Sequence, residues 1–217
     1  MKIKCNNCGK VSSKSKKLLW RNIRRLGIGK DDYLKIYLCR KCRMKLTGSG
    51  NLDWDNISQI PNLPEQFIEK YKDYVNWDDI SRYQKLSEKL IGKYKVYVYW
   101  DYISQCQKLS EKFIGKYKDY VDWYNISQYQ KLSEPFIEKY KRYVVWSYIS
   151  RYQKLSEQFI EKHQNELDWD YINRYQKLSP EFVLKHIDKM TEDIFYNPCY
   201  KKFPNSLKLL LKQKFNI

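Results

Sequence analysis

The sequence contains few of the side chains on which enzyme sites most often depend. Its 217 residues include only two histidines, seven glycines and three methionines. Histidine is the usual group for proton transfer near neutral pH and a common metal ligand, so its scarcity disfavours acid–base and metal-dependent catalysis. We therefore expect a protein that is not an enzyme and has no small-molecule substrate.

Long apolar stretches are missing as well. The sequence has no run of about 18 apolar residues, the length that a membrane-spanning helix needs. The first residues, Met1 to Cys5, do not lead into the apolar segment of a secretory signal. These two observations predict an intracellular protein that does not cross a membrane and is not secreted.

Acidic side chains are outnumbered by basic ones, 25 to 42, which gives a net charge of +17. Residues 1–50 carry 15 lysines and arginines against Asp31 and Asp32, whereas residues 51–191 carry 22 basic and 21 acidic side chains. A concentrated positive field attracts polyanions. The two parts of the chain are therefore expected to have different roles.

A short run of small residues, Thr47 to Asn51, separates these parts. Its two glycines neither propagate a helix nor fill a strand, which is typical of a linker. The sequence therefore predicts four segments: a basic module at 1–47, a linker at 48–53, a repeat region at 54–191, and a C-terminal cap or basic tail at 192–217.

Tryptophan recurs every 23 residues, which defines a tandem repeat. With each Trp as position 1, isoleucine stands at position 4, leucine at position 10, and tyrosine or histidine at position 18. Apolar residues in each half of the repeat are three or four apart, which is helical spacing. The six repeats begin at Trp54, Trp77, Trp100, Trp123, Trp146 and Trp169.

Serine at position 11 precedes the second apolar series, where a helix N-cap would stand. The predicted caps are Ser87, Ser110, Ser133, Ser156 and Ser179, and Pro180 then takes the first helical position. Each repeat is thus predicted to hold a first helix of about two turns and a second of about three. Helices this short are marginal alone, so they must stack against their neighbours. The predicted fold is mainly α, an α-solenoid of six 23-residue two-helix repeats.

The ends of the array depart from the pattern, as repeats that face solvent on one side should. The first repeat reads Gln59 to Pro64 where others have YQKLS, and the sixth drifts at Ile187 to Thr191. Asn205 to Lys212 is predicted to form a terminal capping helix, with a flexible basic tail as the alternative.

The motif WDYISxYQKLSExFIxKY resembles the tandem repeats of proteins from giant amoeba-infecting DNA viruses, and the resemblance covers residues 54 to about 191. It brings no catalytic residue or ligand with it. It implies a viral origin and a non-enzymatic repeat module, for which the host cytoplasm, the viral factory and the virion are the expected locations.

Two C-x2-C pairs stand near the ends of the basic module. Cys5 with Cys8, and Cys39 with Cys42, supply four thiolates from two tight turns, which suits a tetrahedral Zn²⁺ ion. A four-thiolate shell leaves no open position for water, so the ion is expected to be structural. The alternatives are two disulfides, disfavoured in a reducing compartment, and a redox pair, which would need a βαβ setting.

The residues around the second pair suggest the type of module. Tyr33 to Leu38 alternates as a strand does, and Arg43 to Leu46 begins a helix after the cysteines. Together these features resemble a small treble-clef or ribbon-like zinc finger. Between the pairs, Lys16 to Leu26 is predicted to form a basic amphipathic helix.

Such a zinc finger would hold many basic side chains together. A cluster of this kind binds phosphates in a salt-sensitive way with little sequence preference, and nothing here favours RNA over DNA. A solvated basic face and docking on an acidic protein are the alternatives. The predicted nucleic-acid-binding residues are Lys14, Lys16, Lys17, Arg21, Arg24, Arg25, Arg40, Lys41, Arg43 and Lys45.

Positions 3 and 6 of the repeat vary while the residues around them stay constant. Repeat proteins present tunable binding surfaces in this way, so we interpret these positions as a face for a protein partner. A one-base-per-repeat nucleotide code and ordinary solvent variation are the alternatives. The predicted partner-binding residues are Asp79, Arg82, Tyr102, Tyr148, Arg151, Tyr171 and Arg174.

Three side chains invite a chemical interpretation that the repeat argues against. His163 and His186 stand at position 18, and Cys106 at position 7, where most other repeats have tyrosine. We expect the histidines to replace packing aromatics and the Cys106 thiol to be buried or half-buried. The tryptophans are likewise expected to form inter-repeat core rather than a stacking platform for bases.

These observations favour a two-part, non-enzymatic protein. In this hypothesis a basic zinc finger binds nucleic acid or a nucleoprotein, and an α-solenoid binds a protein partner. The alternative is a protein–protein interaction scaffold throughout, in which the zinc finger is structural and docks on an acidic protein surface.

Overall fold

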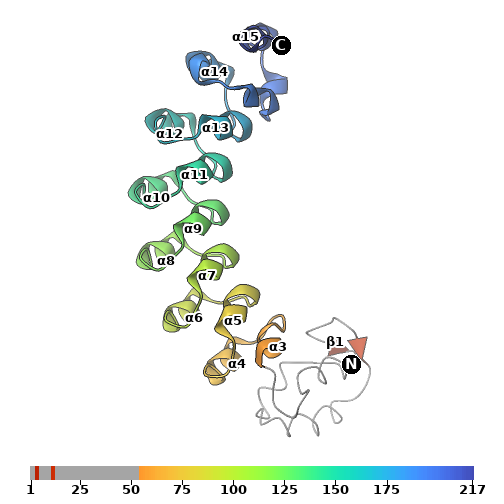
Figure 1. Cartoon of the computed structure of the whole chain (residues 1–217), viewed down its shortest axis with the longest axis vertical. Helices are drawn as coiled ribbons and strands as arrows, with labels where there is room; N and C mark the ends of the chain where they lie inside the picture. Colours follow the sequence, from red (N-terminus) through yellow and green to blue (C-terminus); the bar gives the residue numbers. More distant parts are fainter. Residues whose placement is uncertain (1–2, 5–10, 13–53) are drawn as a thin grey trace. The chain divides into compact units, whose positions relative to one another are not determined.

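The structure is a computed structural model that describes residues 3–4, 11–12 and 54–217, and most of the described chain is helical (Figure 1). Its contacts divide the chain into an N-terminal unit that ends at Gln107 and a C-terminal unit that begins at Lys108. Both units contain regularly repeating helix pairs of about 23 residues, as the tryptophan spacing predicts. Two short strands, β1 (Ile3–Lys4) and β2 (Val11–Ser12), pair antiparallel.

In the N-terminal unit, the first helix of each repeat begins at its tryptophan. These first helices are α3 (Trp54–Ser58), α5 (Trp77–Tyr83) and α7 (Trp100–Cys106), and the second helices are α4 (Glu65–Lys70) and α6 (Glu88–Lys93). Helix α5 contacts both α3 and α7. The first helices therefore form one row and the second helices another (Figure 1).

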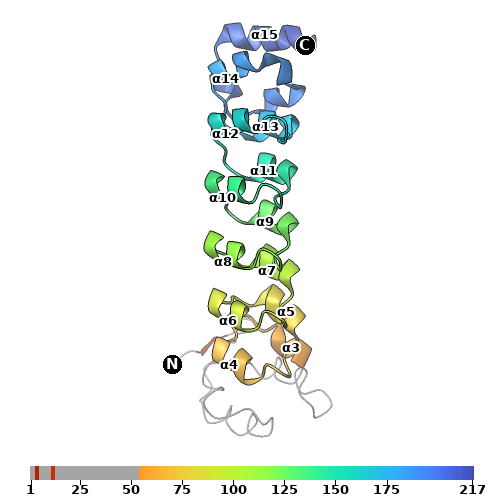
Figure 2. The same cartoon turned by 90° about the vertical axis from the view of Figure 1, so that its left-hand side faces the viewer.

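The C-terminal unit has the same two rows. Its first helices are α9 (Trp123–Tyr129), α11 (Trp146–Tyr152) and α13 (Trp169–Tyr175), and its second helices are α8 (Glu111–Lys116), α10 (Glu134–Lys139), α12 (Glu157–Lys162) and α14 (Pro180–Lys185). Helix α11 contacts α9 and α13. Three 3-10 helices follow, η2 (Ile187–Lys189), η3 (Glu192–Tyr196) and η4 (Tyr200–Lys202), and then α15 (Asn205–Phe215), so the terminal segment is helical (Figure 2).

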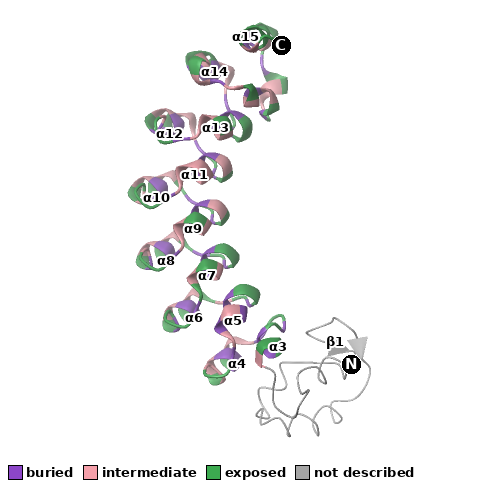
Figure 3. Cartoon of the chain, in the orientation of Figure 1, coloured by how far each residue is buried: buried purple, intermediate pink, exposed green. Residues whose placement is uncertain are grey.

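Isoleucine at two positions of the repeat forms the centre of the core. Each helix is buried along one side and exposed along another (Figure 3). Position 4 carries isoleucine in all six repeats, and position 15 carries isoleucine in five and Val183 in the sixth; none of these side chains is more than 3% exposed. Full burial of such a side chain contributes about 1.5–3 kcal/mol.

The serine caps are confirmed. The Ser156 hydroxyl accepts a hydrogen bond from the backbone N–H of Phe159 at 3.2 Å, and the four other predicted caps make the same contact. Pro180 begins α14, as predicted. In the first repeat Pro64 replaces the cap and makes no side-chain bond.

The predicted length of the second helix is wrong. Each second helix has six residues rather than about three turns, because the backbone leaves the helical region at position 18. At Tyr94, for example, φ is −109° and ψ is 31°. The chain then makes one further turn, closed by a bond from Val98 N–H to Tyr94 C=O at 3.1 Å. This bond keeps the four-residue spacing of the buried apolar side chains without a continuous helix.

A buried glutamine at position 8 joins each repeat to the one before it. The Gln153 amide donates to the carbonyl oxygens of Ser127, at 2.9 Å, and Gln130, at 2.8 Å, and its Oε1 accepts from Leu132 N–H at 3.0 Å. Gln176 repeats this geometry one repeat later. Past the last repeat, Asn197 donates to the carbonyls of Asn173 and Gln176 and takes over the role.

A buried serine at position 5 makes a second link along the same path. The Ser150 hydroxyl donates to Trp146 C=O at 2.8 Å and accepts from Asp168 N–H at 2.9 Å. The serine thus ties the start of its own first helix to the residue that precedes the next first helix. We call the glutamines at position 8 and the serines at position 5 the seam.

The tryptophans of the repeats, expected to form inter-repeat core, are half-buried except for Trp77, which is buried. Trp146 is half-buried and stacks on aromatic rings of its own repeat, with its centroid 5.0 Å from His163 and 6.4 Å from Phe159. The indole N–H of Trp169 donates to Gln164 C=O in the preceding repeat at 3.0 Å. The indole therefore connects repeats through its polar edge rather than as a fully buried core residue.

Candidate partner-binding site

The N-terminal predictions fall outside the described residues. The predicted zinc ligands, Cys5, Cys8, Cys39 and Cys42, and the ten basic residues from Lys14 to Lys45 all belong to this part. They therefore stay predictions. The seven predicted partner-binding residues all lie in described helices.

The first helices bring positions 3, 6 and 7 of the repeat together on one face, where most of these side chains are exposed or half-buried and Ile60 and Asp79 are buried. We call the side chains at these three positions the strip. A side chain at position 6 contacts one at position 3 of the next repeat, on the neighbouring first helix of the same row. This contact recurs as Gln59 with Asp79, Arg82 with Tyr102, and Arg151 with Tyr171.

In the C-terminal unit, Arg151 is the centre of the strip. Its guanidinium lies over three tyrosine rings, 5.0 Å from the centroid of Tyr152 and 5.4 Å from those of Tyr171 and Tyr175. A cation over an aromatic face contributes about 0.5–1 kcal/mol at exposed sites. Three such contacts hold the guanidinium in place between α11 and α13.

Arg174 continues the strip toward η3. Its guanidinium lies 5.8 Å from the ring centroid of Tyr175 and 4.9 Å from that of Tyr196. It also forms an ion pair with Asp193, with 3.1 Å between Nη1 and Oδ1. This pair shows that a guanidinium of the strip can receive a carboxylate while it rests on tyrosine.

At the other end of the C-terminal strip, Tyr148 at position 3 contacts Tyr124, which stands at position 2 of the preceding repeat and lies outside the strip as defined. Tyr124 and Tyr148 meet edge to face with centroids 4.5 Å apart. The hydrogen bond with Tyr124, together with partial burial, raises the pKa of the Tyr148 phenol to about 12. Gln128 Nε2 donates to the Tyr152 hydroxyl at 3.4 Å, so the strip side chains of successive repeats form a connected set.

The N-terminal unit carries a smaller version of the strip. The Arg82 guanidinium lies 5.2 Å from the ring centroids of both Tyr83 and Tyr102. Asp79 is buried and its Oδ2 accepts from Gln59 Nε2 at 3.2 Å. Cys106, expected to be buried or half-buried, is exposed; partial desolvation raises the pKa of its thiol and nearby Arg82 lowers it. The position faces outward, so no aromatic packing is lost there.

Beyond position 3, which includes Asp79, the charged residues of the strip and of the residues after it are positive. In the second to sixth repeats, positions 6 to 9 contain three arginines and five lysines but no carboxylate. The lysines stand at position 9, are exposed, and are Lys85, Lys108, Lys131, Lys154 and Lys177. The acidic residues of these repeats stand elsewhere, mainly at positions 2, 12 and 16. The nearly neutral repeat region therefore has its charges segregated by position.

The histidines pack as expected and also make polar contacts. His163 lies 4.5 Å from Phe159 between ring centroids, and its Nε2 lies 2.6 Å from Glu138 Oε2. A hydrogen bond from Lys162 lowers the pKa of Glu138 to about 2, helped by His163 and Lys141 and opposed by desolvation. His186 lies 4.5 Å from Phe182 in the same way.

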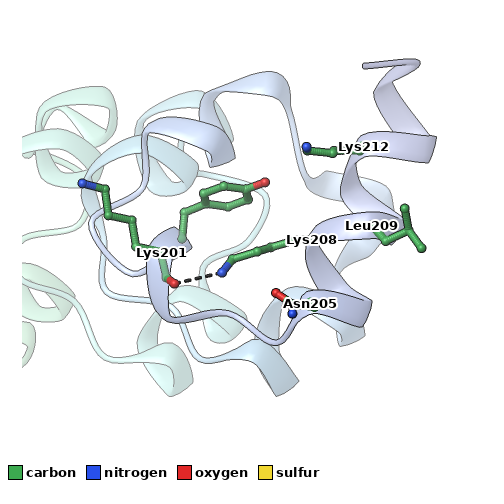
Figure 4. A pocket seen from close by; sticks show the side chains of 6 residues that line it. Lys201, Asn205, Lys208, Leu209 and Lys212 are labelled. Carbon is green, nitrogen blue, oxygen red and sulfur yellow. Dashed lines mark hydrogen bonds between the residues drawn. The ribbon is translucent and has the colours of Figure 1, made fainter.

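Two surface hollows each include three lysines in their lining. One of about 540 Å³ lies at α15 and includes Tyr200, Asn205 and Lys208, whose Nζ donates to Lys201 C=O at 2.9 Å (Figure 4). The other, of about 400 Å³, lies between α8 and α10. There a Cβ at Gly115 would lie 2.5 Å from the Tyr140 hydroxyl, so a larger residue would need that side chain to shift.

Comparison with protein families, curated proteins and solved structures found no match for this chain. The resemblance to giant-virus repeats therefore stays a prediction. No helix among the described residues is long and apolar enough to cross a membrane. Within residues 54–217 and the two strands, no three His, Cys, Asp or Glu side chains are grouped to hold a metal ion.

The seam was not predicted from the sequence. Glutamine at position 8 recurs in five of six repeats, but it lies among lysine and serine and suggests a solvated loop. Its constancy beside the variable position 6 was the available signal. Buried polar groups are hydrogen-bonded, so a glutamine that recurs next to variable positions can indicate a buried hydrogen-bonding role.

Proposed function

We propose that this chain is a non-enzymatic scaffold, in which the helix pairs stack as an α-solenoid and the strip holds a protein partner. The observation that carries this proposal is the register of positions 6 and 3. Because each such contact joins neighbouring repeats, side chains from separate helices act as one surface. Tyrosine and arginine are also the residues most enriched at the energetic centres of protein interfaces.

The N-terminal module is proposed to bind nucleic acid or a nucleoprotein around a structural zinc ion. Cys5, Cys8, Cys39 and Cys42 would hold the ion, which would fix the fold of a segment too small to build a large core. The pairing of β1 with β2 supports this, since residues 5–10, between the strands, include the first cysteine pair. A viral origin and a location in infected cells belong to the same proposal.

The first test concerns the module and uses the full chain. Zinc content is measured for the wild type and for the Cys39→Ser/Cys42→Ser variant, and each is titrated with labelled single-stranded RNA and duplex DNA at two salt concentrations. We expect one zinc ion in the wild type and nucleic-acid affinity that falls steeply with salt. Absence of binding at low salt would instead favour a scaffold that contacts only proteins.

The second test concerns the strip. Capture experiments from infected cells compare the wild type with Arg151→Gln/Tyr171→Asn and with a control, Arg142→Gln. Gln and Asn already occupy positions 6 and 3 of other repeats, at Gln128 and Asn125, so the variant keeps the repeat frame. Proteins lost with the strip variant and kept with the control support the proposal. An identical set of captured proteins in all three contradicts it.

A further inference from the structure

The strip offers a cation that is already held in place and carries no counterion. Arg151 forms no ion pair within residues 54–217, although three tyrosine rings surround it. A guanidinium has five N–H donors, so Arg151 can bind an anion from its edge while it also hydrogen-bonds to Tyr171. Because its position is fixed before binding, it loses little conformational entropy when an anion arrives.

The neighbouring repeat shows which anion fits. Arg174 has the same two-sided tyrosine packing, and it binds the carboxylate of Asp193 from η3. Arg151 stands at the same position one repeat earlier, and there Asp170, which follows it by the same 19 residues, is exposed and forms no ion pair with it. A carboxylate from another molecule would complete at Arg151 the contact that Asp193 makes at Arg174.

Lysines extend the positive surface along the repeats of the C-terminal unit. Lys131, Lys154 and Lys177 are exposed, each two residues after a strip tyrosine, and form no ion pair within the described helices and turns. Two residues span at most about 7 Å, so the Cα atom of each lysine lies within about 7 Å of that of its tyrosine. A ligand on this face therefore meets at least one cation in each repeat.

The distance between repeats restricts the form of the ligand. Packed helices lie about 8–10 Å apart. A peptide in the polyproline II conformation advances about 9 Å in three residues, so one side chain in three would meet successive repeats. This period matches an extended segment better than a folded surface, and the cations of the strip and of position 9 favour an acidic one.

The rings are poorly placed for stacking of bases. Stacking of single-stranded nucleic acid requires open aromatic faces. In the strip, guanidinium groups lie over Tyr152, Tyr171 and Tyr175, and Tyr148 meets Tyr124 edge to face. The exposed parts include the ring edges, the hydroxyls and the guanidinium N–H groups, which suit carboxylates and backbone carbonyls.

We infer that the C-terminal strip binds an extended acidic segment of a protein partner, with a carboxylate at Arg151 and others at the position-9 lysines. This inference rests on the proposed partner-binding function and specifies its chemistry. The partner segment is expected to carry Asp or Glu at about every third residue and to be rich in proline.

The test uses zinc-loaded full-length protein and labelled twelve-residue peptides, measured by fluorescence anisotropy. One peptide repeats Glu-Pro-Pro. A second has the same composition with its glutamates clustered at one end, and a third repeats Gln-Pro-Pro. The clustered peptide controls for attraction to the basic N-terminal module, because it has equal charge but the wrong spacing. A single-stranded RNA dodecamer is the fourth probe.

We expect the spaced acidic peptide to bind tightest. Arg151→Gln/Tyr171→Asn should weaken it about tenfold, since a hydrogen-bonded charge contact contributes about that factor, while Arg142→Gln should change it little. Thermal melting of each variant verifies that the fold is intact. Photo-crosslinking of the spaced peptide should label α11 and α13.

Three results would overturn the inference. Equal binding of the spaced and clustered peptides to all variants would show attraction by net charge alone. Strip-dependent binding of Gln-Pro-Pro as strong as that of Glu-Pro-Pro would remove the acidic requirement but leave the partner-binding function intact. Strip-dependent binding of the RNA alone would make nucleic acid the ligand. Failure of the partner-binding function itself would appear in the capture experiment, as no partner lost with the strip variant.

Discussion

The seam and the strip are both polar and periodic, yet they differ in what they contact. Gln153 bonds three backbone groups of the preceding repeat and is only 6% exposed. Arg151, which stands two residues earlier in the chain, contacts tyrosine side chains on an exposed face. One residue is fixed by main chain that every repeat possesses, and the other by side chains that differ between repeats.

This difference explains why position 8 is constant and position 6 varies. A change at position 8 leaves buried N–H and C=O groups without partners, whatever the neighbouring side chains are. A change at position 6 alters a surface that water can still solvate. The constancy of position 8 therefore reflects its buried bonds, and the variation at position 6 marks a place where one repeat differs from another in its contacts.

The largest expected effect comes from breaking the seam. Gln153→Ala leaves Leu132 N–H and two carbonyl oxygens without their bonds, and should lower the free energy of unfolding by about 3 kcal/mol. Urea unfolding followed by circular dichroism measures it. The matched change in the strip, Gln128→Ala, should cost no more than about 0.5 kcal/mol. Similar losses in the two variants would contradict the distinction.

A smaller effect is expected at the serine of the seam. Ser150→Ala removes the acceptor for Asp168 N–H and should lower the free energy of unfolding by about 1–2 kcal/mol. Ser147, three residues earlier in the same helix, is the control, and Ser147→Ala should have little effect. The same unfolding measurement applies, and equal midpoints for the two variants would count against a structural role for position 5.

The second helices carry an ion pair between repeats, Glu138 with Lys162, whose contribution to stability can be compared with that of the seam. The pKa of Glu138 is lowered from 4.5 to about 2, chiefly by the hydrogen bond from Lys162. A lowered carboxyl pKa stabilises the fold above the unfolded value, and that stability is lost as pH falls from about 4.5 toward 2. Lys162→Gln should raise the Glu138 pKa, measured by carboxyl carbon NMR, and make acid unfolding less steep over this range.

Lys154→Gln is the matched control. This substitution removes the same charge from the same repeat, and Lys154 does not contact Glu138. An equal rise in the pKa of Glu138 in both variants would mean that net charge, rather than the Lys162 contact, sets the titration.

The smallest effect concerns the contact between Tyr148 of the strip and Tyr124, which stands at position 2 of the preceding repeat. Tyr124→Phe removes the hydrogen bond that is the main reason why the Tyr148 pKa is about 12, so Tyr148 should titrate closer to 10. Ultraviolet difference absorbance of tyrosinate follows the titration. Tyr129→Phe, in the same helix, should leave it unchanged. A Tyr148 that titrates identically in the wild type and Tyr124→Phe would show that the pair is not formed in solution.

Much of the fold followed from local signals. The 23-residue spacing of tryptophan, the serines at position 11 and the three- and four-residue apolar spacing predict the helix pairs and their start points, and the structure has them. These signals act within about one turn of helix, where each residue meets neighbours fixed by the helical period. The length of the second helix was not predictable from them, since an apolar stripe continues across its end.

The residues of the candidate site could be predicted only in part from these local signals. Variation at positions 3 and 6 selected Arg82, Tyr102, Arg151 and Tyr171, and the structure brings each arginine onto the tyrosine of the next repeat. The variation alone did not reveal that Asp79 is buried, that Cys106 is exposed, or that position 7 joins the strip. Each of these depends on which face of a first helix meets its neighbour.

The sequence by itself determined the repeat, its helices, their caps and the isoleucine core, because all of these arise from residues a few places apart. Tertiary structure alone decided which polar residues are buried in the seam and which lie in the strip. Gln153 finds its partners 21 to 26 residues back and Arg151 contacts a ring 20 residues on. A polar side chain has the same local pattern whether it meets water or a carbonyl, and only the stacking of one repeat on the next supplies the carbonyl.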